Sequence, residues 1–247
     1  MRKELLDLKV RSIVLLIAIT GLFFVIAPLQ KVTINMLSEN AEAVEKFIGK
    51  GFVENLKDWK FYIYSQWFGK NFGQFIPIIA IIFAFPLFSR EYESGTIEFL
   101  LTRNSRQRVF VNKLFVSSII LLAEIVFFSI LPAIYSIIFS KELNYSYLFQ
   151  FMIHVILGGM FWYSVTYMFS VVFNDQVKPI LFSVVFLGGT TALGFLKPLQ
   201  FLNTYTYILG TDILKGEGIN VSYSFMLLLL TVIILIISYQ VFLKKEI

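Results

Sequence analysis

A charged segment, residues 89–113, lies between two long apolar runs. It reads S-R-E-Y-E-S-G-T-I-E-F-L-L-T-R-N-S-R-Q-R-V-F-V-N-K, with an acidic start, a Gly-Thr turn, one or two amphipathic helical turns and a basic end. This segment is too polar for the bilayer core and too patterned for a plain linker. The chemistry that it offers is recognition. We expect a short helix, roughly parallel to the membrane, that docks into another protein on the cytoplasmic side.

Two ionisable residues, Glu124 and His154, stand inside apolar runs. Ionisable groups inside a membrane are costly, so both are candidate residues of a transport path. Glu124, near the middle of its run, could bind a cation, pair with a substrate amine, or hydrogen-bond within the helix bundle while protonated. His154 lies one to two turns into its run. The alternative is that neighbouring Ser, Tyr or backbone groups satisfy both side chains.

The motifs of catalysis are missing from the sequence. It has no G-x-x-x-x-G-K-[ST] phosphate loop, no H-E-x-x-H, no G-x-S-x-G, no cysteine and only one histidine. A phosphate loop cradles nucleotide phosphates, and the other motifs supply zinc ligands or a serine nucleophile. We therefore expect no catalytic, cofactor or metal site in this chain. It should not hydrolyse ATP by itself.

The composition is that of a membrane protein. Of the 247 residues, 57% are hydrophobic and only 15% charged, with a mean hydropathy of +0.78, whereas a soluble domain is about a quarter charged. The apolar runs are continuous and do not alternate with period two, which favours helices over a barrel. We predict one all-α integral membrane domain, residues 1–247. Its six spans lie at about 12–30, 71–89, 114–140, 147–173, 179–196 and 221–243.

The basic residues predict the orientation of the spans. With six helices both termini lie on one side, and if that side is the cytoplasm all the arginines lie inside: Arg2, Arg11, Arg90, Arg103, Arg106 and Arg108. The net charge of +5 then reflects membrane topology and not nucleic-acid binding. Residues 1–11 are short and amphipathic. They predict an interfacial helix on anionic lipid headgroups, or else a simple basic flank.

Three further segments carry structural expectations. The aromatic stretch 59–68 is expected at the depth of the outer headgroups, with a ligand-binding surface as the alternative. Residues 196–218, broken by Pro198 and three glycines, predict a re-entrant or interfacial hairpin on the outer side. The pairs Gly158-Gly159 and Gly188-Gly189 predict close helix packing, or flexing during transport.

The segment 89–113 resembles the cytoplasmic segment of ABC-2 type transporter permeases. The matching positions are Glu91, Gly95-Thr96, the stretch Glu98-Phe99-Leu100-Leu101, Ser105-Arg106 and Lys113. Where the family often has a proline in the polar break, this chain has Arg103-Asn104. The ending V-F-L-K-K-E-I and the layout of the apolar runs are also similar to the family's. The resemblance covers the whole chain in layout and about 25 residues in detail.

The resemblance implies an ATP-driven exporter with an ABC-2 (type V exporter-like) fold. Two permeases, identical or paralogous, would pair, and each would hold a separate ABC-type ATPase subunit that carries ATP and Mg²⁺. Residues 90–108 would form the coupling segment. Both termini of the permease would lie in the cytoplasm (N-in, C-in), on the same side of the membrane as this segment. The implied ATPase-coupling residues are Glu91, Glu93, Gly95, Thr96, Glu98, Phe99, Leu100 and Leu101. Glu91 and Glu93 would meet basic residues of the ATPase, and the three apolar residues would anchor the helix in it.

The resemblance also implies a location and a range of cargo. The expected location is the bacterial plasma membrane, with several spans. A small chain rich in Phe and Ile suits permeases that move hydrophobic or amphipathic peptides such as bacteriocins, lantibiotics or toxin peptides. A small hydrophobic drug, a lipid or an ion is the alternative cargo. A proton-coupled secondary transporter using Glu124 and a non-transporting membrane scaffold or sensor are the alternative functions.

Overall fold

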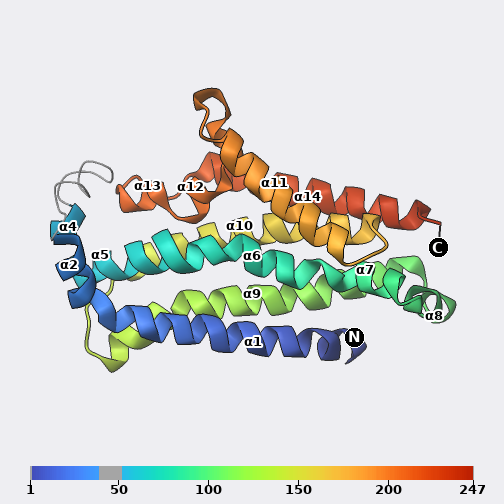
Figure 1. The fold of residues 1–247 in the computed structure, drawn as a ribbon, viewed down its shortest axis with the longest axis horizontal. Coiled ribbons are helices and arrows are strands. Elements are labelled where there is room, and N and C mark those ends of the chain that lie inside the picture. Colours follow the sequence, from blue (N-terminus) through green and yellow to red (C-terminus); the bar gives the residue numbers. More distant parts are fainter. Residues whose placement is uncertain (1, 39–51, 247) are drawn as a thin grey trace.

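The computed structural model describes residues 2–38 and 52–246, with backbone only for residues 2–4 and 52. All the regular structure in these two ranges is helical, and the long helices lie side by side (Figure 1). Five segments are long and apolar enough to cross a membrane: Leu5–Ser38, Trp59–Glu93, Arg106–Ile138, Tyr145–Val172 and Val221–Lys244. The remaining predicted span, 179–196, corresponds to α11 (Val177–Leu193), which has only 17 residues. A helix of about 20 residues is needed to cross a bilayer, so the count of six stays a prediction.

The N-terminal segment continues into the first span. Helix α1 runs without a break from Arg2 to Ile26, so the separate interfacial helix expected at residues 1–11 is not a separate element. No proline interrupts these residues. The α-helix ends at the short η1 (Ala27–Leu29), which contains Pro28, and α2 (Gln30–Ser38) follows. Leu8 is buried against the rest of the protein while Leu5 and Leu6 are exposed. The first turns of α1 are thus partly packed against protein.

The second span is built from four helical pieces that follow α4 (Phe52–Asn55). They are α5 (Trp59–Ile63), the π-helical η2 (Tyr64–Asn71), α6 (Phe72–Ala84) and α7 (Pro86–Glu93). Asp58 caps α5 by accepting a hydrogen bond from the Lys60 amide. Pro86, which cannot continue the hydrogen-bonding of a preceding helix, marks the junction of α6 and α7.

The aromatic stretch 59–68 is part of the protein core, at the end of the bundle opposite α8 (Thr96–Arg103); its depth in the membrane and its ligand-binding alternative stay predictions. Tyr62, Tyr64, Trp67 and Phe68 are almost wholly buried. Their polar atoms reach backbone carbonyls of other elements: Tyr62 donates to Ile26, Tyr64 to the carbonyl of Asn144 and Trp67 to that of Phe128. A buried Tyr or Trp with its polar atom paired is stable inside a protein, so these contacts hold the second span to α1, α9 (Arg106–Ile138) and the start of α10 (Tyr145–Val172).

Helix α10 (Tyr145–Val172) is the centre of the bundle. It packs against α6, α9 (Arg106–Ile138) and α14 (Val221–Lys244). At Gly158 an added Cβ would lie 2.3 Å from Ile208 Cγ1, and at Gly159 2.7 Å from Ile125 Cδ1, so both glycines allow close packing as predicted. Gly188-Gly189 on α11 differs, because an added Cβ there would meet nothing within 4 Å.

The expected hairpin at 196–218 is a chain of short helices: η3 (Lys197–Leu202), α12 (Thr204–Ile208) and α13 (Thr211–Leu214). Gly210 adopts φ +64° between the last two, a conformation that glycine accepts without strain. Trp162 of α10 donates a hydrogen bond to the Thr204 hydroxyl at 3.0 Å. The short helices α12 and α13 therefore lie against other helices, whereas η3 has no buried residue.

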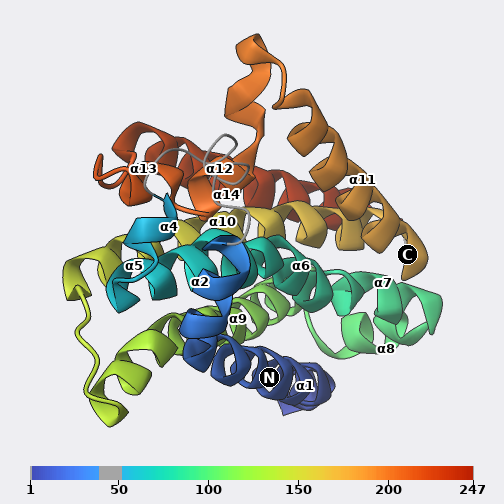
Figure 2. The same cartoon turned by 60° about the vertical axis from the view of Figure 1, so that its left-hand side comes forward.

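The two ends of the bundle hold different elements. Both termini lie at the end that carries α7 and the following α8 (Thr96–Arg103) (Figure 1). Helices α4, α5 and α13 lie at the opposite end, and a view turned by 60° agrees (Figure 2). An arrangement with both termini at one end is what an even number of crossings gives.

Candidate functional site

Helix α8 is the short polar helix that the sequence predicted, and a glycine turn positions it. Gly95 has φ +68°, so the chain can turn sharply between α7 and α8 where a side chain would be strained. At the far end Asn104 is extended and Ser105 caps α9, its hydroxyl accepting from the Arg108 amide. The helix is thus held between two defined breaks.

The two faces of α8 differ in exposure. Ile97 is buried, and Leu100 and Leu101 are half-buried against the core. On the other face Phe99 is 73% exposed, with Glu98 and Arg103 exposed beside it. Of the three expected apolar anchors, Phe99 alone is fully presented to solvent. Leu100 and Leu101 fasten α8 to its own protein.

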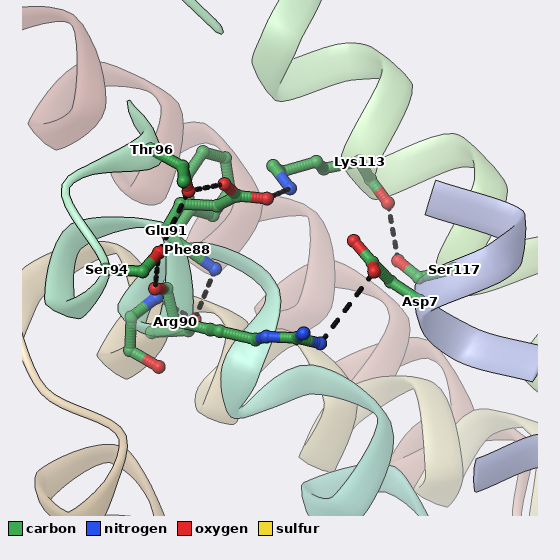
Figure 3. A network of polar contacts seen from close by, with 10 residues as sticks. Asp7, Phe88, Arg90, Glu91, Ser94, Thr96, Lys113 and Ser117 are labelled. Atoms are coloured by element: carbon green, nitrogen blue, oxygen red, sulfur yellow. Dashed lines mark hydrogen bonds and ion pairs between the residues drawn. The ribbon is translucent and has the colours of Figure 1, made fainter. Parts of the chain in front are cut away.

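Glu91 lies inside the protein, in contrast to the contact with an ATPase that the sequence predicted (Figure 3). Its carboxylate pairs with the Lys113 ammonium at 3.1 Å and accepts a hydrogen bond from the Thr96 hydroxyl. Glu91 and Lys113 are both almost fully buried, at 5% and 2% exposure. A buried charge is very costly unless paired, so each of these residues requires the other. Glu91 therefore joins the end of α7 to α9 and to the first residue of α8.

The end of α7 has further ties to neighbouring elements. Arg90 lies 3.8 Å from Asp7 of α1 (Figure 3). The exposed Glu93 accepts a hydrogen bond from Gln176, in the loop between α10 and α11, at 2.6 Å. Asp175 lies in the same loop, and the hydrogen bond that it accepts from the side chain of Lys178, in the first turn of the following helix, lowers its pKa. Glu93 keeps the exposure expected of it while also holding this loop.

Two cations cap helix ends around α8, and sequence reasoning assigned no role of this kind to them. Arg106 Nη1 donates to the carbonyls of Phe242, Leu243 and Lys245, at the end of α14. Lys245 Nζ donates to Val171 and Val172, at the end of α10, and lies 3.7 Å from the centre of the Tyr92 ring. Cations stabilise the carbonyls that a helix leaves unpaired at its C-terminus. The sequence carries a signal for both caps: Arg106 directly follows the polar break, and Lys245 follows the last apolar run.

Glu124 and His154 are both buried, on α9 and α10 respectively. Ser12 of α1 donates a hydrogen bond to Glu124 Oε1, and Oε2 is buried with no hydrogen-bond partner among the described residues. His154 Nδ1 is hydrogen-bonded to the carbonyl of Tyr207 at 2.7 Å, and the two rings stack. The two residues contact different elements, so they do not form one site. Neighbouring groups satisfy each of them in part.

The described residues contain no group of three or more His, Cys, Asp or Glu side chains placed to hold a metal ion. The polar contacts between elements gather instead around α8, as ion pairs and hydrogen bonds that are here called ties. Through Asp7, Lys113, Gln176, Arg106 and Lys245 these ties reach α1, α9, the α10–α11 loop and the ends of α10 and α14.

The fold and this arrangement define a class: a multi-pass helical membrane protein with a short, partly exposed helix at the end where both termini lie. A family model described as ABC-2 family transporter protein matches residues 1–247. The chain belongs to this family and is a multi-pass protein of the plasma membrane. No curated protein and no solved structure matches it.

Proposed function

We propose that this chain is the membrane subunit of an ATP-driven exporter and that α8 docks into a separate ABC-type ATPase. The observation that carries the proposal is the 73% exposure of Phe99 on a helix whose other face is fixed by the buried Ile97. A large exposed aromatic residue flanked by charges is typical of an interface anchor. In this proposal ATP and Mg²⁺ belong to the partner and the chain itself catalyses nothing.

The proposed roles of the coupling residues differ. Phe99 enters a cleft of the ATPase, and Glu98 and Glu93 meet its basic residues. Glu91, Gly95 and Thr96 position the helix, since the carboxylate, the turn and the hydroxyl form one connected unit. Leu100 and Leu101 transmit force, since they pack against the core.

Movement of the ATPase would then reach the spans by two routes. One runs from Thr96 through Glu91 to Lys113, near the start of α9. The other runs from the end of α8 through Arg106 to the last carbonyls of α14. Ion pairs and hydrogen bonds of this kind are rigid when fully satisfied, which supports their use in transmission.

The proposed cargo is a hydrophobic or amphipathic peptide, and two copies of the chain would enclose its path. Most of α11 is exposed, with only Pro179, Ser183 and Leu187 buried, and Gly188-Gly189 leaves a flat place for a second copy to approach. Helix α1 is also mainly exposed. Cysteines introduced on these two helices should crosslink between copies, and crosslinks confined to one copy would exclude this pairing.

A second function rests on Glu124. Its buried, partner-free Oε2 supports a proton-coupled transporter as the competing function. Export by vesicles with ATP alone or with a proton gradient alone separates the two. We expect ATP to suffice in native protein and in Glu124→Gln. Export driven by the gradient alone and lost in the variant would establish the competing function.

The docking role of α8 is tested by co-purification with the ATPase. Phe99→Ala should weaken the retention of the ATPase strongly. Phe195→Ala is the matched control, since Phe195 is 79% exposed and lies outside α8. Membrane insertion should be the same for both variants, since neither alters a long apolar span. Equal retention by both variants would contradict the docking role of α8.

A further inference from the structure

An apolar groove lies between α10, α11, η3 and α14, away from α8. Its volume is about 310 Å³, at the lower end of the range found for small-ligand pockets. Side chains that line it include Trp162 and Val165 of α10, Phe186 of α11, and Met226 and Leu230 of α14. Helix α11 forms one side of the groove. Few of its residues are buried, so it packs loosely against α10 and α14 and leaves this space between them.

The polar atoms at the edge of the groove are already used. Trp162 Nε1 donates to Thr204, the Tyr223 hydroxyl to the carbonyl of Phe201, and the Thr190 hydroxyl to that of Phe186. The remaining wall is hydrocarbon and aromatic ring. Apolar cavities of this kind do not hold water and accept apolar guests. A guest that needs hydrogen bonds would find none here without breaking one of these.

The shape of the groove fits one leaflet of a bilayer. On α14 its lining runs from Tyr223 to Ile234, which at about 1.5 Å per residue is a length of about 16 Å. That is half of the roughly 30 Å hydrocarbon core. The lining lies in the first half of α14 but in the second half of α10, from Phe161 to Phe169, so the groove extends along the helix axes through the middle of the bundle.

We propose that this groove binds one acyl chain of a membrane phospholipid. The wall supplies apolar contact without hydrogen bonds, its length matches half a bilayer, and the membrane surrounds the helices that form it. The chain fills the gap between α11 and α14 and thereby fixes the position of α11. The proposal requires only that the protein spans a membrane and is independent of ATP and of the docking of α8.

Tryptophan fluorescence tests the proposal directly. The three tryptophans are Trp59, Trp67 and Trp162, and only Trp162 lines the groove. All are buried, so bromine on a lipid acyl chain quenches Trp162 only if the chain enters the groove. The protein is reconstituted into phosphatidylcholine vesicles with acyl chains brominated near either end. Trp162 is followed in Trp59→Phe/Trp67→Phe, and independently as the difference between native protein and Trp162→Phe.

We expect strong quenching of Trp162 by brominated lipid in both measurements. In Thr190→Phe/Leu230→Phe, which narrows the groove from two sides, the quenching should fall to the level of protein lacking Trp162. In the matched control Val185→Phe/Leu229→Phe, which alters exposed positions of the same helices outside the groove, it should be unchanged. A Trp162 that is not quenched, or is quenched equally in both double variants, overturns the proposal. The first result would mean that a second copy or a peptide covers the groove.

Discussion

Aromatic rings pack at both ends of the helix bundle, but the charges at the two ends differ in burial. Tyr64 stacks on Phe151 at the end opposite α8, and Phe88 packs on Phe242 at the α8 end. The Glu91–Lys113 pair at the α8 end is buried, whereas both side chains of the Lys60–Glu142 pair at the other end are exposed. A buried pair depends on both partners far more than an exposed pair does, so the two ends should respond differently to the loss of a charge. In the proposed function, the end with the buried pair is the one that transmits the movement of the ATPase.

Breaking the buried ion pair should have the largest effect. Lys113→Met removes the cation of the buried pair with Glu91, and breaking a buried pair by removing one partner costs about 3–5 kcal/mol. Glu91→Gln/Lys113→Met removes both charges and should recover most of that loss. Thermal unfolding in detergent of the native protein, the two single variants and the double variant measures the coupling free energy. Single variants as stable as the native protein would show that the pair does not hold the α8 end.

The double variant also separates stability from transmission. We expect it to bind the ATPase normally but to export less cargo per ATP hydrolysed, since Thr96 would lose its charged partner. Normal export per ATP in a stable double variant would restrict Glu91 and Lys113 to a structural role.

Removing a cap should have an intermediate effect. Arg106→Gln loses charged hydrogen bonds to the end of α14, at about 1.5–3 kcal/mol. Arg103→Gln is the control, since Arg103 is exposed on α8 and such changes are usually within about 0.5 kcal/mol. Hydrogen exchange at the last turn of α14 should rise in the first variant only. Equal protection in both would mean that solvent caps α14 as well as Arg106 does.

Overpacking the contact between α10 and α12 should lower the stability of the fold without changing the export of cargo per ATP hydrolysed. Gly158→Ala pushes a methyl group into the buried Ile208, and overpacking of this kind costs about 1–3 kcal/mol. Gly188→Ala, on the open face of α11, should stabilise the isolated chain by about 0.5–1 kcal/mol. Both are followed by thermal unfolding, and export per ATP should stay constant. A loss of dimer in Gly188→Ala would identify that face as the contact between copies.

Much of the fold was predictable because membrane spans follow from length and hydrophobicity. The predicted spans 147–173 and 221–243 agree with α10 and α14 to within two residues at each end. The turn at Gly95 was predictable for a local reason, since a sharp turn before a helix needs a residue that accepts positive φ. The broken hairpin was likewise signalled by its proline and glycines.

The pairing of residues far apart in the chain was not predictable in the same way. An exposed and a buried glutamate look alike in the sequence, so Glu91 was expected on the surface although Lys113 pairs with it inside. The burial of the aromatic stretch 59–68 was not predictable either, because its partners, the carbonyls of Ile26, Phe128 and Asn144, lie in other segments. Only tertiary contacts decide such cases.

The docking of α8 is tested most directly by crosslinking, for which the absence of native cysteine gives a clean background. Single substitutions Phe99→Cys and Thr102→Cys on the exposed face of α8 are compared with Phe195→Cys far from it, using a short bifunctional reagent in membranes that contain the ATPase subunit. We predict that both α8 variants crosslink to the ATPase and that Phe195→Cys does not. Labelling of the ATPase from Phe195→Cys, with none from Phe99→Cys or Thr102→Cys, would contradict the docking of α8.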